Sequence, residues 1–69
     1  MEKDKLQELL ISPDTTIKQT MRKLNVTAQQ ILFVVDPNNR ILGMITDGDI
    51  RRGIVRGLEF DDQIEKAMN

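Results

Sequence analysis

The residues that could do chemistry in this chain lie within one short stretch, "GMITDGDIRRG", residues 43–53. It places a hydroxyl group, two carboxylates and two guanidinium groups directly after an apolar run. Thr46 and Asp49 have the spacing of a capping box, in which side-chain oxygens accept hydrogen bonds from the free amides of a helix's first turn. On this interpretation, the stretch does no more than start a helix.

The same residues also suit a ligand. A helix that starts at a strand end presents free amides and a positive dipole end, which favour an anion. The Thr46 hydroxyl can donate to a phosphate, and Gly48 allows a ligand to approach the backbone closely. The Asp49 carboxylate suits a sugar diol because it accepts two hydroxyl hydrogen bonds. With Arg51 and Arg52 as phosphate clamps, these residue types describe a site for a phosphorylated ribose or a nucleotide.

The composition excludes several classes of enzyme. The 69 residues make one small domain, which contains no cysteine and no histidine. Disulfides, cysteine nucleophiles, Cys/His zinc sites and histidine-dependent triads are therefore excluded. Asp47 and Asp49 lie in one helical turn, without a nucleophile or an orienting base, so we do not expect catalysis. We also predict no metal site and no required cofactor, because no set of oxygen ligands is seen to converge.

Charge and hydropathy limit the partners. The formal net charge is -1, and the only aromatic residues are Phe33 and Phe60, so we expect no nucleic-acid partner. No apolar run approaches the roughly 20 residues that span a bilayer, and the start lacks a secretory signal, so we expect no membrane partner. A cytoplasmic location is the default expectation.

The elements that must position the stretch can be predicted from apolar spacing. Leu6, Leu9 and Leu10 predict a short leading helix, followed by a brief extended link at residues 11–12 before Pro13. Next comes a helix in "TTIKQTMRKLN", with a capping box at Thr16 and Gln19 and a stop at Asn25. Its apolar stripe is formed by Ile17, Met21 and Leu24.

Two strands and a second helix follow. The run "ILFVV", residues 31–35, predicts a strand buried on both faces, and "DPNNR" predicts a turn into a second antiparallel strand, "RILGMIT". The second helix should carry an apolar stripe of Ile50, Ile54 and Leu58, widened by Val55. Its Gly53 and Gly57 indicate either a close contact between two copies or a helix stop at Gly57. A last short helix would start with a capping box at Asp62 and Glu65.

The run "ILFVVDPNNRILGMITDGDIRRGI" resembles a CBS motif, named after cystathionine β-synthase. It matches the family's "G-h-h-T-x-x-D" signature, where h is apolar, with the positions Gly43, Met44, Ile45, Thr46 and Asp49. The resemblance covers about residues 9–60, after a leading helix at residues 1–8. Residues 61–69 resemble a connector toward a second motif, which is absent. The implied fold is α+β, a β-α-β-β-α unit with a short leading helix and a connector helix.

The resemblance implies a regulatory, non-catalytic module. In the family, two motifs pair and bind adenosyl ligands such as AMP, ADP, ATP or S-adenosylmethionine. The residue matching Asp49 holds the ribose hydroxyls, the one matching Thr46 contacts phosphate, and apolar residues line the base pocket. The predicted ligand-binding residues are therefore Thr46, Asp49, Ile11, Pro13, Met44, Ile45, Arg51 and Arg52.

The resemblance also implies partners. "TDGDIRR" is similar to CBS regions attached to sugar-phosphate isomerases and sugar nucleotidyltransferases, and a position next to Met1 favours the nucleotidyltransferase arrangement. Because this chain holds one motif, it needs a second motif or a second copy of itself as a homodimer partner. Two alternatives remain open: a dimerisation or assembly domain that binds no ligand, or a sensor of a sugar nucleotide or sugar phosphate.

Overall fold

The computed structural model describes residues 7–27 and 30–68. The elements in chain order are β1 (Leu10–Ile11), α2 (Ile17–Thr27), β2 (Ile31–Val35), β3 (Ile41–Thr46), α3 (Asp47–Val55) and the 3-10 helix η1 (Ile64–Ala67). This order confirms the predicted α+β class and the β-α-β-β-α unit. Among the described residues, no helix has the length and apolar character needed to cross a membrane.

The three strands form one sheet in the order β1-β2-β3. β1 pairs with β2 in parallel, and β2 pairs with β3 in the predicted antiparallel hairpin. In the turn between them, Asn39 adopts a positive φ of 62°, a conformation that asparagine tolerates better than most residues. The register places Ile31 opposite Thr46 and Phe33 opposite Met44.

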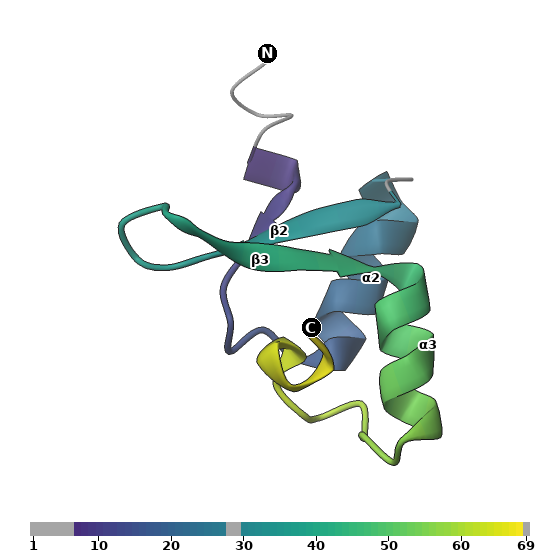
Figure 1. Cartoon of the computed structure of the whole chain (residues 1–69). Helices are drawn as coiled ribbons and strands as arrows, with labels where there is room; N and C mark the ends of the chain where they lie inside the picture. Colours follow the sequence, from purple (N-terminus) through teal and green to yellow (C-terminus); the bar gives the residue numbers. More distant parts are fainter. Residues whose placement is uncertain (1–6, 28–29, 69) are drawn as a thin grey trace.

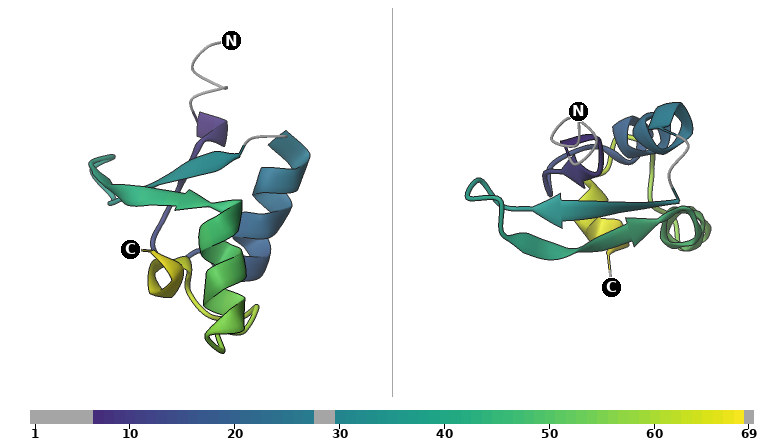
Figure 2. Two further views of the ribbon diagram at one scale, coloured as in Figure 1. Left: turned by 45° about the vertical axis from the view of Figure 1, so that its right-hand side comes forward. Right: turned by 90° about the horizontal axis from the view of Figure 1, so that it is seen from above.

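Both helices and η1 lie on one side of the sheet (Figures 1 and 2). The core between these layers contains five fully buried apolar residues: Ile17, Leu32, Val34, Ile45 and Ile64. The other face of the sheet is open, since Leu42 and Met44 are about half exposed. β2 was expected to be buried on both faces, but Ile31 and Phe33 are only half-buried, while Leu32, Val34 and Val35 are buried. Within residues 7–27 and 30–68, no element forms a second layer over that face.

The start of α2 confirms the predicted capping box. The Thr16 amide donates to the Gln19 side-chain oxygen at 3.0 Å, and the Gln19 amide donates to the Thr16 hydroxyl at 3.1 Å. The predicted stop at Asn25 is wrong, because α2 continues to Thr27. Asparagine has only a modest helix-propensity penalty, so it does not end a helix anchored by a buried residue one position earlier, Leu24.

The segment before α2 differs from the prediction at Leu10. Residues 7 and 8 are helical, but Leu10 lies in β1 rather than in the leading helix. Its register partner is Phe33 of β2, and its carbonyl accepts a hydrogen bond from the Lys23 ammonium group at 2.8 Å. These long-range partners outweigh local helical spacing. The remainder of the predicted leading helix, residues 1–6, lies outside the described residues.

The chain after α3 returns to the start of α2; residues 60–68 are called the C-terminal strap below. The Ile17 amide donates to the Asp62 carbonyl at 2.9 Å, and the Ile64 amide donates to the Thr15 carbonyl at 2.7 Å. Because Ile64 is fully buried and Ala67 is nearly so, the strap contributes to the core. The segment predicted as a connector is therefore packed against the motif.

The predicted capping box of the last helix is wrong. The N-cap of η1 is Gln63, and it makes no side-chain capping hydrogen bond. The Asp62 carboxylate instead accepts the Glu59 amide at 2.7 Å and the Lys66 ammonium group at 3.3 Å. These bonds lower the pKa of Asp62, first through the Glu59 amide and then through Lys66, against a smaller opposing effect of burial. The Asp62 carboxylate is therefore bonded within the turn at residues 59–62 and does not form the predicted capping box.

The two glycines of α3 have separate roles. Gly57 has a φ of 109° and follows the end of the helix, which confirms the predicted stop. Gly53 is buried, and a Cβ atom there would lie 2.9 Å from the Leu58 Cδ1 atom. The chain itself therefore fills the space at Gly53. The structure favours the helix stop over the alternative prediction, a contact between two copies through the glycine pair. Val55 does not widen the apolar stripe, because it is 83% exposed.

Candidate functional site

The candidate site lies where β3 passes directly into α3. Thr46 is the last residue of β3 and the N-cap of α3, with extended backbone angles. Its hydroxyl accepts the Asp49 amide at 3.2 Å, and the Asp49 carboxylate accepts the Thr46 amide at 3.0 Å. The predicted capping box is confirmed. Because no loop separates the two elements, the strand sets the position of the helix start.

The Asp49 carboxylate is held by both of its oxygens. Oδ2 accepts hydrogen bonds from the Thr46 amide and hydroxyl, both at 3.0 Å, and Oδ1 accepts one from Arg52 Nη2 at 2.6 Å. The side chain is 12% exposed. Burial acts to raise the pKa of Asp49, but the bonds from Thr46 and Arg52 and the Arg52 charge outweigh it, so the pKa lies below its ordinary value. The group is therefore a preorganised anion at neutral pH.

The two neighbouring arginines have different partners, a difference that their spacing of four residues from Asp47 and three from Asp49 could have predicted. Arg52 binds the Asp49 carboxylate, whereas Arg51 binds the Asp47 carboxylate at 2.9 Å. The Arg51–Asp47 pair is exposed on both sides, at 76% and 67%. Exposed pairs of this kind contribute little to stability. Only Arg52 is connected to the carboxylate of the candidate site.

A surface hollow of about 890 Å³ opens beside the start of α3. Three elements line it: the β3–α3 junction through Thr46, Asp47 and Gly48; the start of β2 through Gln30 and Ile31; and α2 through Met21, Leu24 and Asn25. Sequence reasoning missed the contribution of β2. The hairpin pairing contained the necessary signal, because the first residue of β2 must lie beside the last residue of β3.

The predicted apolar ligand residues do not gather at this hollow. Met44 is 52% exposed on the open sheet face, next to the register pair Ile31 and Thr46. Ile11 and Ile45 belong to the core, and Ile45 has no exposed surface. Within this chain, Ile45 therefore offers no surface to a ligand and Ile11 offers very little.

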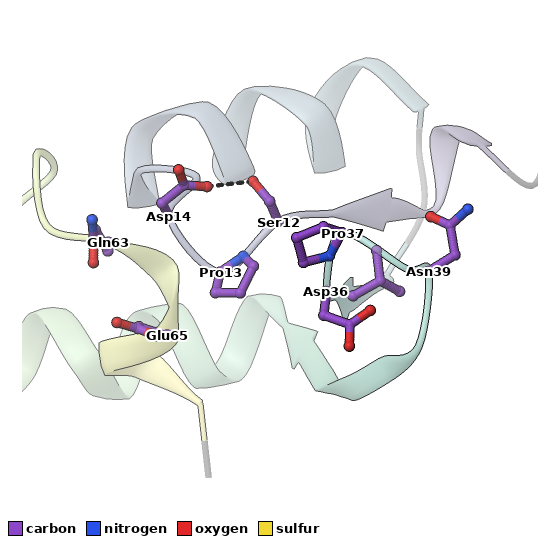
Figure 3. Close-up of a pocket in the computed structure, with 9 residues that line it drawn as sticks. Ser12, Pro13, Asp14, Asp36, Pro37, Asn39, Gln63 and Glu65 are labelled. Atoms are coloured by element: carbon purple, nitrogen blue, oxygen red, sulfur yellow. Dashed lines mark hydrogen bonds between the residues drawn. The ribbon is translucent and has the colours of Figure 1, made fainter.

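Pro13 lies at a second hollow, of about 630 Å³ (Figure 3). Ser12, Asp14, Asp36 and Pro37 also line it, and the Ser12 hydroxyl donates to Asp14 at 2.5 Å. Because β1 runs parallel to β2, the chain after Ile11 passes the carboxyl end of β2, whereas Thr46 lies beside its start. The structure thus places Pro13 and Thr46 at opposite ends of β2. Among residues 7–27 and 30–68, no three carboxylates converge as metal ligands.

A three-stranded sheet covered on one face, with a capped helix starting at a strand end, defines a single α+β motif with one open apolar face. Residues 6–56 match the CBS domain, so the chain belongs to the CBS domain family.

Known proteins resemble the chain in sequence and in fold. An uncharacterised protein of Helicobacter pylori strain J99 is 30% identical over 56 residues, which are 81% of this chain and 17% of that protein. An uncharacterised conserved protein from Pyrococcus horikoshii is 31% identical with a TM-score of 0.81, over 88% of this chain and 47% of that one. A CBS domain protein from Pyrobaculum aerophilum, complexed with AMP, is 17% identical with a TM-score of 0.79, over 88% and 48% of the two chains. The chain therefore spans about half of these solved chains and a sixth of the curated relative.

Proposed function

We propose that this chain is a non-catalytic regulatory module that binds an adenine nucleotide at the start of α3 and controls an attached enzyme. The observation that carries the proposal is the Asp49 carboxylate, held as an anion by Thr46 and Arg52 at the positive end of a helix. The AMP complex of the Pyrobaculum aerophilum protein, which shares this fold, supports an adenosine nucleotide as the ligand class.

Each part of the ligand has a matching group. The ribose hydroxyls would donate to the Asp49 carboxylate, because a carboxylate accepts two hydrogen bonds from a diol. The phosphate would receive hydrogen bonds from the Arg52 guanidinium, whereas a contact of the Thr46 hydroxyl with phosphate stays a prediction, because that hydroxyl donates its one proton to Asp49 Oδ2 in this structure. Ile31 and Met44 would supply apolar surface for the base, since they lie beside Thr46 on the open face of the sheet. A role for Ile11 and Pro13 at the base stays a prediction.

The open sheet face supports a partner motif. Leu42 and Met44 are exposed, and Ile31 and Phe33 are half-buried, so an apolar surface remains uncovered on the side away from the helices. A second CBS motif or a second copy of this chain would cover it. A ligand between the two motifs would favour one arrangement of the pair, and the attached enzyme would respond to that shift in population. We propose a sugar nucleotidyltransferase or sugar-phosphate isomerase as that enzyme, from the resemblance of "TDGDIRR".

Calorimetric titration of the wild-type chain, Asp49→Asn and Asp47→Asn with AMP, ADP, ATP and S-adenosylmethionine tests the proposal. Asparagine keeps one oxygen for the Thr46 amide but loses the charge and the second acceptor oxygen. We expect Asp49→Asn to weaken binding about 10- to 100-fold, the equivalent of a lost hydrogen bond to a charged group. Asp47→Asn removes the same charge from an exposed side chain whose hydrogen-bond partner is Arg51. It should change affinity less than about threefold.

Two results would contradict the proposal. If the wild type binds none of the four ligands, the proposal that the chain binds an adenosyl ligand is wrong. Equal losses in both variants would remove the specific role of Asp49. Circular dichroism spectra of each variant must match the wild type, so that a loss of affinity is not a loss of fold.

The open apolar face also favours a second candidate, an assembly domain that binds no ligand. In that case, Asp49→Asn would dimerise as the wild type does in analytical ultracentrifugation, and no nucleotide would raise the thermal midpoint. A nucleoside diphosphate sugar and a sugar phosphate, titrated in parallel, distinguish the third possibility, a sensor of sugar metabolites.

A further inference from the structure

The two oxygens of the Asp49 carboxylate have different partners. Oδ2 is committed to the capping box through the Thr46 amide and hydroxyl. Oδ1 takes no part in the cap and accepts its hydrogen bond from Arg52 Nη2 at 2.6 Å. A sugar diol that approaches Asp49 without breaking the cap must therefore bind at Oδ1, the oxygen that Arg52 contacts.

Arg52 is placed so that it can exchange partners. Its side chain is 64% exposed, while the Asp49 side chain is 12% exposed, so the arginine is the partner free to move. The guanidinium extends back over the first turn of α3, because a Cβ atom on Gly48 would lie 3.3 Å from Arg52 Nη1. Gly48 and Thr46 both line the hollow at the helix start. A phosphate bound there would lie within the reach of the same guanidinium.

We propose that Arg52 makes the site selective for nucleotides over nucleosides by exchanging the Asp49 carboxylate for the ligand's phosphate. Because Oδ1 accepts about two hydrogen bonds, a nucleoside whose two ribose hydroxyls both donate to it displaces Arg52 and gives the guanidinium no anion in return. A nucleotide brings its own anion, to which guanidinium binds well through several parallel donors. Ribose recognition and phosphate recognition are thereby coupled through one side chain. This inference rests on the proposed function and names the residue that sets its specificity.

Arg51 provides a matched control one position earlier on the same helix. It carries the same charge and forms an ion pair of similar length, but its partner is the exposed Asp47 carboxylate. Replacing either arginine with glutamine removes one positive charge from α3 and keeps a side chain of good helix propensity. Only the change at position 52 releases the Asp49 carboxylate.

The test measures the affinities of AMP and adenosine by calorimetry for the wild type, Arg52→Gln and Arg51→Gln. For Arg52→Gln, we expect AMP to bind about tenfold more weakly, through loss of a charged hydrogen bond to phosphate. We expect adenosine to bind about 2- to 5-fold more tightly, because it no longer competes with an ion pair. The preference for AMP over adenosine therefore falls about 20-fold or more, whereas Arg51→Gln keeps it within about threefold.

Two outcomes overturn the inference and leave the proposed function intact. In the first, Arg52→Gln weakens AMP and adenosine equally, which makes Arg52 a support for the carboxylate rather than a competitor of the ribose. In the second, Arg51→Gln lowers the preference as much as Arg52→Gln does, which makes the effect one of general charge. Failure of AMP to bind the wild type is a different result, because it removes the proposed function itself.

Discussion

The C-terminal strap predicts a large loss of stability from a single truncation, Ile64→Ala. Ile64 lies outside residues 6–56, the span that matches the CBS domain, yet it is fully buried. Its amide donates to the Thr15 carbonyl at 2.7 Å, which joins η1 to the segment before α2. If the strap is part of the core, shortening this side chain must weaken the whole domain.

The magnitude follows from the atoms removed. Ile64→Ala deletes three carbon groups, each worth about 0.8 kcal/mol when buried, for a loss of about 2.4 kcal/mol. The cavity that remains adds to this loss, and buried isoleucine-to-alanine changes cost about 2–5 kcal/mol in total. For a domain of this size, each kcal/mol lowers the thermal midpoint by about 4–8 °C. We therefore expect a drop of about 8–40 °C.

The assay is urea and thermal unfolding, followed by far-ultraviolet circular dichroism. Val55→Ala is the control, because Val55 is 83% exposed on α3 and its truncation should change the free energy of unfolding by less than about 0.5 kcal/mol. A loss below about 1 kcal/mol for Ile64→Ala, or one equal to the Val55→Ala loss, would refute the reasoning. The strap would then be a connector resting on the surface.

Two further predictions concern the start and the end of α3. Because the Asp49 pKa is lowered in the folded chain, its contribution to stability is fully present above the unfolded pKa of about 4 and is lost as the pH falls through the folded pKa. The difference in unfolding free energy between wild type and Asp49→Asn, measured by urea titration, should therefore shrink from pH 7 to pH 3; a constant difference would contradict this reasoning. Gly57 has a φ of 109°, and a Cβ atom added there would meet nothing within 4 Å, so Gly57→Ala should lose about 1–2 kcal/mol from backbone strain alone. Urea unfolding of Gly57→Ala beside the exposed control Val55→Ala measures this loss, and an unchanged midpoint would show that the strain is absent.

Local features of the fold could be predicted because their causes lie within a few residues. The capping boxes at Thr16 and Thr46 each need only a side chain three positions later, and both are present. The hairpin needs an apolar run on either side of a turn, and the stop at Gly57 needs one residue that accepts a positive φ. Such interactions depend little on the rest of the chain.

Predictions from local patterns fail, or cannot be made, for features that depend on distant partners. Leu10 has helical spacing but lies in β1, because β2 offers it a strand partner. Asp62 is a local exception: it has capping-box spacing, but the nearby Glu59 amide and Lys66 take its carboxylate. Pro13 was predicted at the same site as Thr46; within this chain, the parallel pairing of β1 with β2 places it toward the other end of β2, and its role at a ligand stays a prediction. In each case, a contact outside the local pattern outweighs it.

The sequence by itself determined that a hydroxyl and a carboxylate meet at a helix start directly after a strand, because a capping box is closed within one helical turn. Only the tertiary structure decided that β2 lines the hollow beside that helix start. It also decided that the strap belongs to the core. These outcomes depend on strand register and on the direction in which side chains leave the packed layers, and neither is encoded in the spacing of any single segment.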